Sequence, residues 1–380
     1  MEFYYLFFLL ILLIGIVGTF LNNKYQNYVL YCMAGLMTLF QGLRWNTGAD
    51  WYQFYWYFDN ASWNILSYLR MGGGRLLEPG YVLLNIVIKT IYNSYTLFLL
   101  ITCAFVNCTY VFWIKKLIRK NLTFVFAIVL LNAPYFPVRQ QLAATIFLWG
   151  VQFIYNRELK KYLVVVAIAT TIHYSSIILI PFYWINKNVK WWVLTLIYVS
   201  CPIITTYLPF IFKPFQELLN VFAGSGSSLL FNQYIEGANM AHAKISSDDS
   251  NLSIYSLVTI CMFGYLKDNF LKLESRGYAS IFLNIYVIGV IGLLIGGIPG
   301  FNEFRRLSYY SLIRFGVLFG LSFNISRRQL DNVFISFLLV FVFSFSYNHL
   351  SKWLVGIYSD LYVPYYSVFE GDRHPIRDLR

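Results

Sequence analysis

Long apolar runs alternate with short polar segments along nearly the whole chain. A helix crosses a hydrocarbon core about 30 Å thick with roughly 20 apolar residues. Runs near this length lie at about 3–21, 28–43, 95–114, 122–136, 138–155, 162–184, 191–208, 252–266, 277–297, 304–323 and 330–347. The alternation of a membrane β-barrel is absent. The pattern predicts an all-α polytopic membrane protein with about 10–12 transmembrane helices, in which residues 1–380 form a single integral membrane domain.

Two long segments between the apolar runs carry little basic charge, at about 45–78 and 210–250. The basic residues gather instead in short clusters at 115–120, 157–161, 267–276 and 327–328. Because cytoplasmic loops are enriched in lysine and arginine, we expect the two long segments on the outer face. If every apolar run crosses, however, 115–120 and 46–78 fall on the same side. A re-entrant helix at 79–92 and a broken helix near 162–190 remove this conflict.

Composition excludes a soluble protein, because 58% of the residues are hydrophobic and only 12% are charged,. The formal net charge of +12 lies in short clusters between spans rather than on one face, which indicates contact with lipid head groups and not with nucleic acid. The five cysteines lie in or beside apolar runs and lack ligand spacing with histidine,. No metal site and no cofactor are therefore predicted.

The stretch GLRWNTGADWYQFYWYF, residues 42–58, follows the second apolar run. Arg44 ends that run, and the turn-forming NTG precedes Asp50, so the loop can bring the carboxylate back toward the guanidinium. The alternative is a snorkelling arginine and an exposed aspartate. The aromatic run that follows suits an interfacial helix at head-group level, which an ordinary aromatic belt also explains.

Three further ionisable residues are out of place in or beside apolar runs. Glu78 precedes Pro79 at the expected start of a helix. A carboxylate is stabilised at a helix N-terminus, so Glu78 can also be explained as part of the helix start. Arg139 follows Pro134 and Pro137 at a helix start, a plausible anion site for which phosphate is the usual ligand. His173 lies well inside an apolar run with hydroxyl neighbours, and a structural role is the simpler interpretation,.

A last cluster, FNEFRRLSYYSLIRFG, contains Arg305, Arg306 and Arg314. On an α-helix, Arg306, Tyr310 and Arg314 would share one face. A side chain that snorkels to the membrane surface accounts for Arg305. Arg314 lies deep enough in the apolar run to need a polar partner. Arginines bind a diphosphate bidentately and stabilise its departure, while a carboxylate takes a proton from an attacking hydroxyl. The out-of-place residues therefore suit a substrate with diphosphate and hydroxyl groups.

The order of these motifs resembles the EpsG-like branch of bacterial polysaccharide polymerases, related in role to the Wzy O-antigen polymerases. The matching stretches are GLRWNTGADWYQFYWYF, LLEPGYVLLNIVIK, VRQQLAATIFLWGVQFI, KKYLVVVAIATTIHYSSIILIPF, RRLSYYSLIR and VPYYSVF, in family order over nearly the whole chain. Two departures are WNTGAD, where an aromatic residue followed by glycine is commoner, and HYSS, where HxSA-like sequences are typical.

The resemblance implies a multi-pass protein of the bacterial inner membrane. Such a protein polymerises undecaprenyl-diphosphate-linked oligosaccharide repeats into O-antigen, capsule or exopolysaccharide at the outer face of that membrane. It would be a metal-independent membrane glycosyltransferase. The resemblance implies that the substrate diphosphate is bound by Arg44, Arg139 and one of Arg305, Arg306 or Arg314. Asp50, Glu78 or His173 would be the base or would orient the acceptor, with Asp50 ranked first. A chain-length regulator and a flippase would be partners. The alternatives are a flippase or exporter of the same lipid, an O-antigen ligase, and a membrane acyltransferase.

Overall fold

The computed structural model describes residues 1–48, 50–72, 76–133, 136, 139–223, 253–297, 302–311, 314–322, 325, 332–355 and 359–370. Side chains at 208–223, 302–303, 311, 314–316, 332–333 and 352–353 lie outside the description. The described chain divides into two compact units, residues 1–183 with 315–380 and residues 184–314. Each unit is described by itself.

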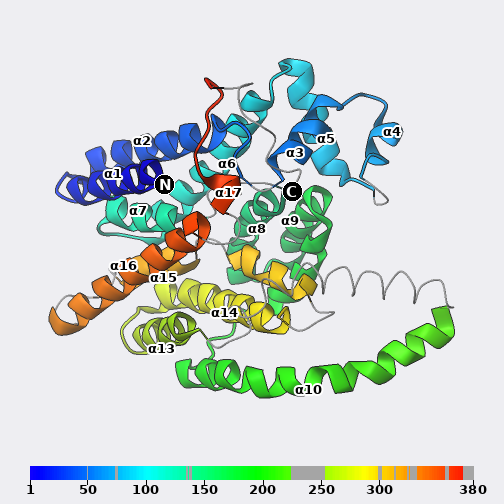
Figure 1. The fold of residues 1–380 in the computed structure, drawn as a ribbon. Coiled ribbons are helices and arrows are strands. Elements are labelled where there is room, and N and C mark those ends of the chain that lie inside the picture. Colours follow the sequence, from blue (N-terminus) through cyan, green and yellow to red (C-terminus); the bar gives the residue numbers. More distant parts are fainter. Residues whose placement is uncertain are drawn as a thin grey trace. The chain divides into compact units, whose positions relative to one another are not determined.

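The first unit is built from helices of very different lengths (Figure 1). They are α1 (Glu2–Gly18), α2 (Asn23–Gly42), α3 (Trp51–Asp59), α4 (Ile65–Leu69), α5 (Pro79–Ile91), α6 (Tyr95–Leu117), α7 (Leu122–Asn132), α8 (Arg139–Tyr155), α9 (Leu159–Ile172), the 3₁₀ helix η1 (Tyr174–Trp184), α15 (Arg314–Ser322), α16 (Asn332–Val355) and α17 (Ser359–Tyr362). The second unit contains α10 (Trp191–Ala223), α13 (Ile254–Asn269), α14 (Leu273–Ile295) and the 3₁₀ helix η2 (Asn302–Ser311).

The predicted all-α membrane protein is confirmed, since the described residues form helices and no strand. By length and composition, the described helices able to cross a membrane are Tyr95–Leu117, Leu273–Ile295 and Phe334–Ser351. Shorter apolar helices are Glu2–Gly18, Pro79–Ile91, Leu122–Asn132, Tyr174–Trp184 and Trp191–Tyr207. The apolar pattern thus marks most helices to within a few residues.

The helices α2 and α6 pack antiparallel over the second half of α2. At one end Lys115 contacts the hydroxyl of Tyr31, and at the other Gly42 packs so closely that an added Cβ would lie 2.6 Å from the Leu100 side chain. Between them Asn107 donates hydrogen bonds to the side chains of both Thr38 and Gln41. The end of α2 that leads to Arg44 is therefore next to the start of α6, far from the basic residues at 115–120.

The helix α5 begins and ends on the side of the 45–78 segment. Near its end the Trp63 indole donates to Thr90, and Lys89 donates to the carbonyl of Asp59. The next helix, α6, then starts at Tyr95, whose ring contacts Trp51. Figure 1 shows α3, α4 and α5 gathered in one region of the first unit. A helix of 13 residues is about 20 Å long, shorter than a hydrocarbon core of about 30 Å,, and a re-entrant α5, which would remove the conflict in sidedness, stays a prediction.

Three boundaries differ from the sequence predictions. The run at 162–184 is two helices, since α9 stops before His173, whose backbone is extended (φ −153°), and η1 follows. The run at 304–323 is likewise divided, because η2 ends at Ser311 and α15 begins at Arg314. The helix α10 continues to Ala223, inside the predicted 210–250 loop; residues 224–250 lie outside the described residues.

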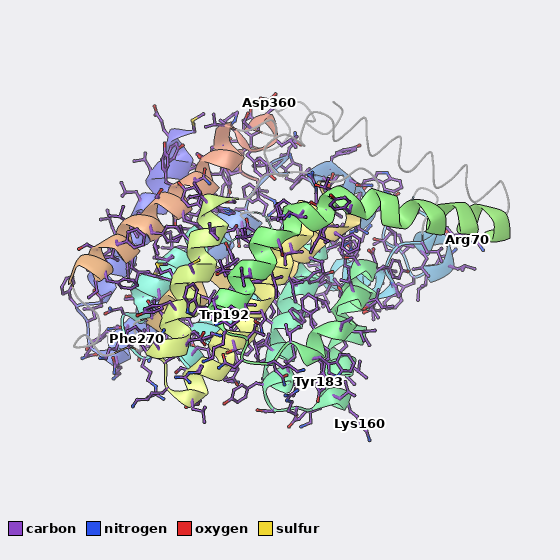
Figure 2. All side chains as sticks on the ribbon, turned by 90° about the horizontal axis from the view of Figure 1, so that it is seen from below. Arg70, Lys160, Tyr183, Trp192, Phe270 and Asp360 are labelled. Atoms are coloured by element: carbon purple, nitrogen blue, oxygen red, sulfur yellow. The ribbon has the colours of Figure 1, made fainter. Side chains whose placement is uncertain are left out.

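The helices α9 and η1 return on one another, so that η1 ends where α9 began. The Tyr162 hydroxyl donates to the carbonyl of Leu179, and the rings of Tyr162 and Tyr183 are 5.6 Å apart. In Figure 2 Lys160 and Tyr183 accordingly lie at the same edge. Lys116 also donates to the side chain of Gln152 near the end of α8. The basic clusters at 115–120 and 157–161 therefore share one side, opposite the turn at His173.

Candidate functional site

A buried carboxylate at the head of α5 joins two other predicted site residues. One Glu78 oxygen accepts a hydrogen bond from Arg139 Nη1 at 2.6 Å, and the other is 2.9 Å from His173 Nδ1. Pro79 occupies the first turn of α5, where its missing N–H costs nothing,. Arg139 begins α8 and His173 ends α9, so three helix termini meet at this carboxylate.

The surroundings of Glu78 hold it ionised. Burial by itself raises the pKa of the Glu78 carboxyl, but the hydrogen bond with His173 and the positive charge of Arg139 outweigh it, so the pKa lies below its ordinary value,. A carboxylate accepting from Nδ1–H leaves the lone pair of a neutral imidazole on Nε2. Glu78 can therefore fix the tautomer and the orientation of His173.

Aromatic rings form a cradle around the guanidinium of Arg139. Its Cζ lies 5.0 Å from the ring centroid of Phe54, 5.8 Å from that of Tyr57 and 5.3 Å from that of Tyr81. The first two rings come from the buried face of α3 and the third from α5. Arginine over an aromatic face at this distance gains about 0.5–2 kcal/mol. We call Phe54, Tyr57 and Tyr81 the Arg139 cradle.

Arg44 is held by a different set of contacts. It is buried, donates from Nη1 to the carbonyl of Gln41 at 2.9 Å, and lies 4.8 Å from the ring centroid of Phe136. The backbone around it pairs with the C-terminal segment 361–368: Trp45 N–H donates to Tyr366, Val368 N–H donates to Leu43, and Arg44 forms a bridge with Ser367. Two quoted motifs from opposite ends of the sequence therefore form one structural unit.

Asp50 does not pair with Arg44, contrary to the expectation from the NTG turn. Asp50 is exposed in a left-handed conformation (φ 57°) that aspartate tolerates,. Burial by the surrounding protein raises the pKa of Asp50, and the charge that opposes this rise is that of Arg139. Arg139 is therefore the cation whose charge acts on this carboxylate, while Arg44 contacts Gln41 and Phe136.

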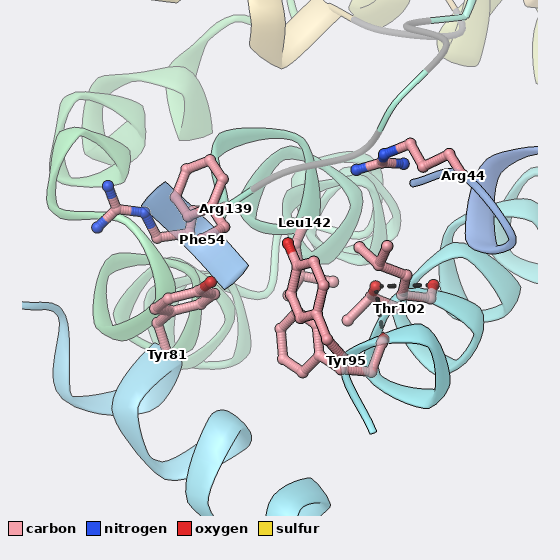
Figure 3. A pocket seen from close by; sticks show the side chains of 9 residues that line it. Arg44, Phe54, Tyr81, Tyr95, Thr102, Arg139 and Leu142 are labelled. Atoms are coloured by element: carbon pink, nitrogen blue, oxygen red, sulfur yellow. Dashed lines mark hydrogen bonds between the residues drawn. The ribbon is translucent and has the colours of Figure 1, made fainter. Parts of the chain in front are cut away.

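Both arginines line one cavity (Figure 3). The remaining lining residues are Phe54, Tyr81, Tyr95, Phe98, Leu99, Thr102 and Leu142. In Figure 3 Arg44 and Arg139 stand on opposite sides of the view, with Tyr95 between them and the rings of Phe54 and Tyr81 beside Arg139. Two cationic side chains in an aromatic wall make the cavity a candidate anion site.

The three remaining arginines belong to the second unit. Arg305 donates from Nε to the carbonyl of Gly296 at 2.8 Å and so ties η2 to the end of α14. Arg306 is half-buried, and the side chain of Arg314 lies outside the described residues. The predicted common face of Arg306, Tyr310 and Arg314 is wrong, because a 3₁₀ helix repeats every three residues and η2 ends before Arg314,. Their contact with the diphosphate stays a prediction.

Sequence reasoning missed the Arg139 cradle and the C-terminal segment as parts of the site. The signals were present, since the aromatic run on α3 and the terminal VPYYSVF are both conspicuous. An aromatic run is equally expected of an interfacial belt, however, and no local pattern joins residue 45 to residue 366.

Comparison with known proteins gives one family. The sequence model described as the EpsG family matches residues 27–367, nearly the whole chain. No curated protein and no solved structure is significantly similar to the chain.

Proposed function

We propose, from the premise that this chain belongs to the EpsG family of Wzy-like polysaccharide polymerases, that it polymerises undecaprenyl-diphosphate-linked oligosaccharide repeats. The growing glycan leaves its lipid carrier and joins a hydroxyl of the next lipid-linked repeat. The product is an O-antigen, capsule or exopolysaccharide chain. The protein is a membrane glycosyltransferase, and its substrates are the lipid-linked glycans.

The observation that carries this proposal is the cavity lined by both Arg44 and Arg139. A diphosphate leaving group gathers negative charge as its bond to the sugar breaks, and guanidinium groups match phosphate oxygens with two parallel hydrogen bonds. Two arginines can therefore supply the charge stabilisation for which other transferases use a metal ion. We propose a metal-independent reaction on this basis.

The proposed step exchanges one C–O bond for another. The acceptor hydroxyl oxygen attacks the anomeric carbon of the donor glycan, and the bond from that carbon to the diphosphate oxygen breaks. The bonding electrons stay on the diphosphate, which leaves as undecaprenyl diphosphate between the two arginines. The acceptor proton passes to a base on the protein, and a glycosidic bond remains.

His173 is the best-supported base of the three candidates. Glu78 contacts its Nδ1, and this hydrogen bond orients the ring so that Nε2 can take the proton,. Glu78 itself already accepts from both Arg139 and His173, which suits an orienting role. Asp50 lies in the field of Arg139 and is proposed to position the acceptor.

The site is proposed to face the outer side of the bacterial inner membrane. The helix termini that carry Glu78, Arg139 and His173 lie opposite the basic clusters at 115–120 and 157–161. Basic loops stay in the cytoplasm, where they also meet anionic lipids. A flippase would deliver the lipid-linked repeats to this side, and a chain-length regulator would act on the same growing chain.

Reconstitution separates this function from the alternatives. We expect the purified protein in proteoliposomes to convert lipid-linked repeats, isolated from a strain lacking this gene, into a ladder of longer chains, and to do so at an unchanged rate in a metal chelator. A flippase or exporter would move the lipid without forming a ladder. A ligase would transfer glycan only when lipid A–core acceptor is added. Absence of any ladder with a correctly folded protein would exclude the polymerase.

The choice of base has its own test in the same system. His173→Gln should lower the single-turnover rate by roughly 10²–10⁴-fold, the usual contribution of a general base, and Asp50→Asn should mainly raise KM for the acceptor repeat. Both variants should keep the wild-type melting temperature. A His173→Gln protein with wild-type rate would return the assignment to Asp50.

A further inference from the structure

Beside the arginine-lined cavity lies a second group of aromatic rings. The rings of Trp51 and Tyr55 stack in parallel, 5.3 Å apart and 4° from coplanar, and Trp45 lies 4.9 Å from Trp51. Tyr95 contacts both Trp51 and Tyr55, and it also lines the cavity. We call Trp45, Trp51 and Tyr55 the aromatic platform. It is continuous with the cavity through one shared residue, Tyr95.

The platform differs from the aromatic residues of a membrane belt. Belt tryptophans present their rings to lipid head groups, as the exposure of Trp56 (39%) and Trp63 (62%) permits. Trp51 is only 4% exposed, and Trp45 and Tyr55 are half-buried. The platform rings are therefore packed against the protein and not turned outward.

Trp51 also carries an unsatisfied donor. Its indole Nε1 is buried and has no hydrogen-bond acceptor among the described residues. A buried donor without a partner costs about 1–3 kcal/mol, and native proteins keep such groups chiefly where a ligand, ion or water completes them. A sugar hydroxyl is an acceptor of the right kind.

We propose that the aromatic platform binds the sugar ring attached to the substrate diphosphate. This inference rests on the proposed function, because it presumes a glycosyl diphosphate in the adjoining cavity. Tyr95 lines the cavity and contacts both Trp51 and Tyr55, so a sugar attached to a diphosphate in the cavity would lie next to the platform. The apolar C–H face of a pyranose packs on the electron-rich face of an aromatic ring. Trp45 and Tyr55 supply such faces, and Trp51 N–H supplies a donor to a ring hydroxyl.

Two probes that differ only in the glycan test this assignment. Binding is measured on the purified protein in nanodiscs with undecaprenyl diphosphate and, separately, with the lipid-linked repeat isolated from a strain lacking this gene. Tyr55→Leu removes a platform ring and Tyr55→Phe keeps it. Trp56→Leu, on the exposed side of the same helix, is the matched control.

We expect Tyr55→Leu to raise Kd for the lipid-linked repeat roughly three- to tenfold, the gain of one aromatic contact, with Kd for undecaprenyl diphosphate unchanged. Tyr55→Phe and Trp56→Leu should bind both probes as the wild type does. If Tyr55→Leu raises Kd for both probes equally, the ring only supports the cavity. If it raises Kd for neither probe, the platform does not contact the sugar. Either result overturns the inference. Arg139→Ala separates the two proposals: if it binds both probes normally, the diphosphate assignment fails whatever Tyr55 does.

Discussion

At the scale of single residues, Glu78 determines the chemistry of the site. It is the group that contacts both Arg139 and His173, at 2.6 and 2.9 Å. Each of the three residues could be selected from the sequence, because a charge or an imidazole in an apolar run is costly. Their pairing could not, because 61 and 95 residues separate Glu78 from its partners. The sequence instead suggested Arg44 as the partner of Asp50, a nearer residue that the fold turns away.

The lowered pKa of Glu78 predicts a pH dependence of stability. Because the folded carboxyl has a pKa below its ordinary value of about 4.3,, the stabilisation is fully present above that value and is lost as pH falls through the folded pKa. The melting temperature in detergent should therefore fall more steeply between pH 7 and pH 3 for the wild type than for Glu78→Gln. Glu158→Gln, which removes the half-buried partner of the exposed Lys161, is the control and should behave as the wild type. Identical pH profiles for the wild type and Glu78→Gln would contradict the ion pair.

At the scale of elements, α3 shows what the sequence could and could not predict. Its composition correctly indicated an aromatic helix. Which rings face the protein depends on tertiary contacts, because Arg139 reaches α3 from another helix. The same holds for η1 and η2, since apolar spacing does not distinguish a 3₁₀ helix from a short α-helix,. The re-entrant helix proposed for 79–92 stays a prediction, since the length of α5, 13 residues, is below that of a span but does not fix its path,.

The Arg139 cradle gives a prediction for α3 itself. Phe54→Leu removes the nearest ring, at 5.0 Å, and should lower kcat/KM roughly three- to thirtyfold, the worth of one such contact. Tyr57→Phe keeps its ring and should stay close to the wild type. The assay is polymer formation in proteoliposomes at limiting lipid-linked repeat. A Phe54→Leu enzyme with unchanged kcat/KM would show that the cradle does not position Arg139.

At the scale of the whole molecule, the first unit separates basic turns from the candidate site. The helices α2 and α6 are antiparallel, α5 ends beside the 45–78 segment, and α8 and α9 leave and rejoin the site. The basic clusters and the long segment at 45–78 are visible in the sequence. They lie on opposite sides of the membrane only if α5 does not cross it. The single-domain prediction for residues 1–380 stays a prediction beside the two compact units.

Sidedness can be measured with single cysteines in a cysteine-free background. Asn93→Cys, in the exposed turn between α5 and α6, should react with a membrane-impermeant maleimide from outside the cytoplasmic membrane, as should Ser62→Cys. Lys160→Cys should react only after the membrane is opened. Protection of Asn93→Cys alongside labelling of Ser62→Cys would mean that α5 crosses the membrane after all.

The most direct test of the central claim is the polymer ladder made by cells whose only copy of this gene carries Arg139→Ala. The claim is that Arg139 and Arg44 hold the diphosphate of a lipid-linked glycan in one cavity. We predict that cells with Arg139→Ala or Arg44→Ala, at wild-type protein levels in the membrane, accumulate single lipid-linked repeats and lose the ladder, as a roughly 10²–10³-fold loss of charge stabilisation requires. Cells with Lys160→Ala, an exposed cation on the opposite side, should make a full ladder. A full ladder from Arg139→Ala would contradict the account.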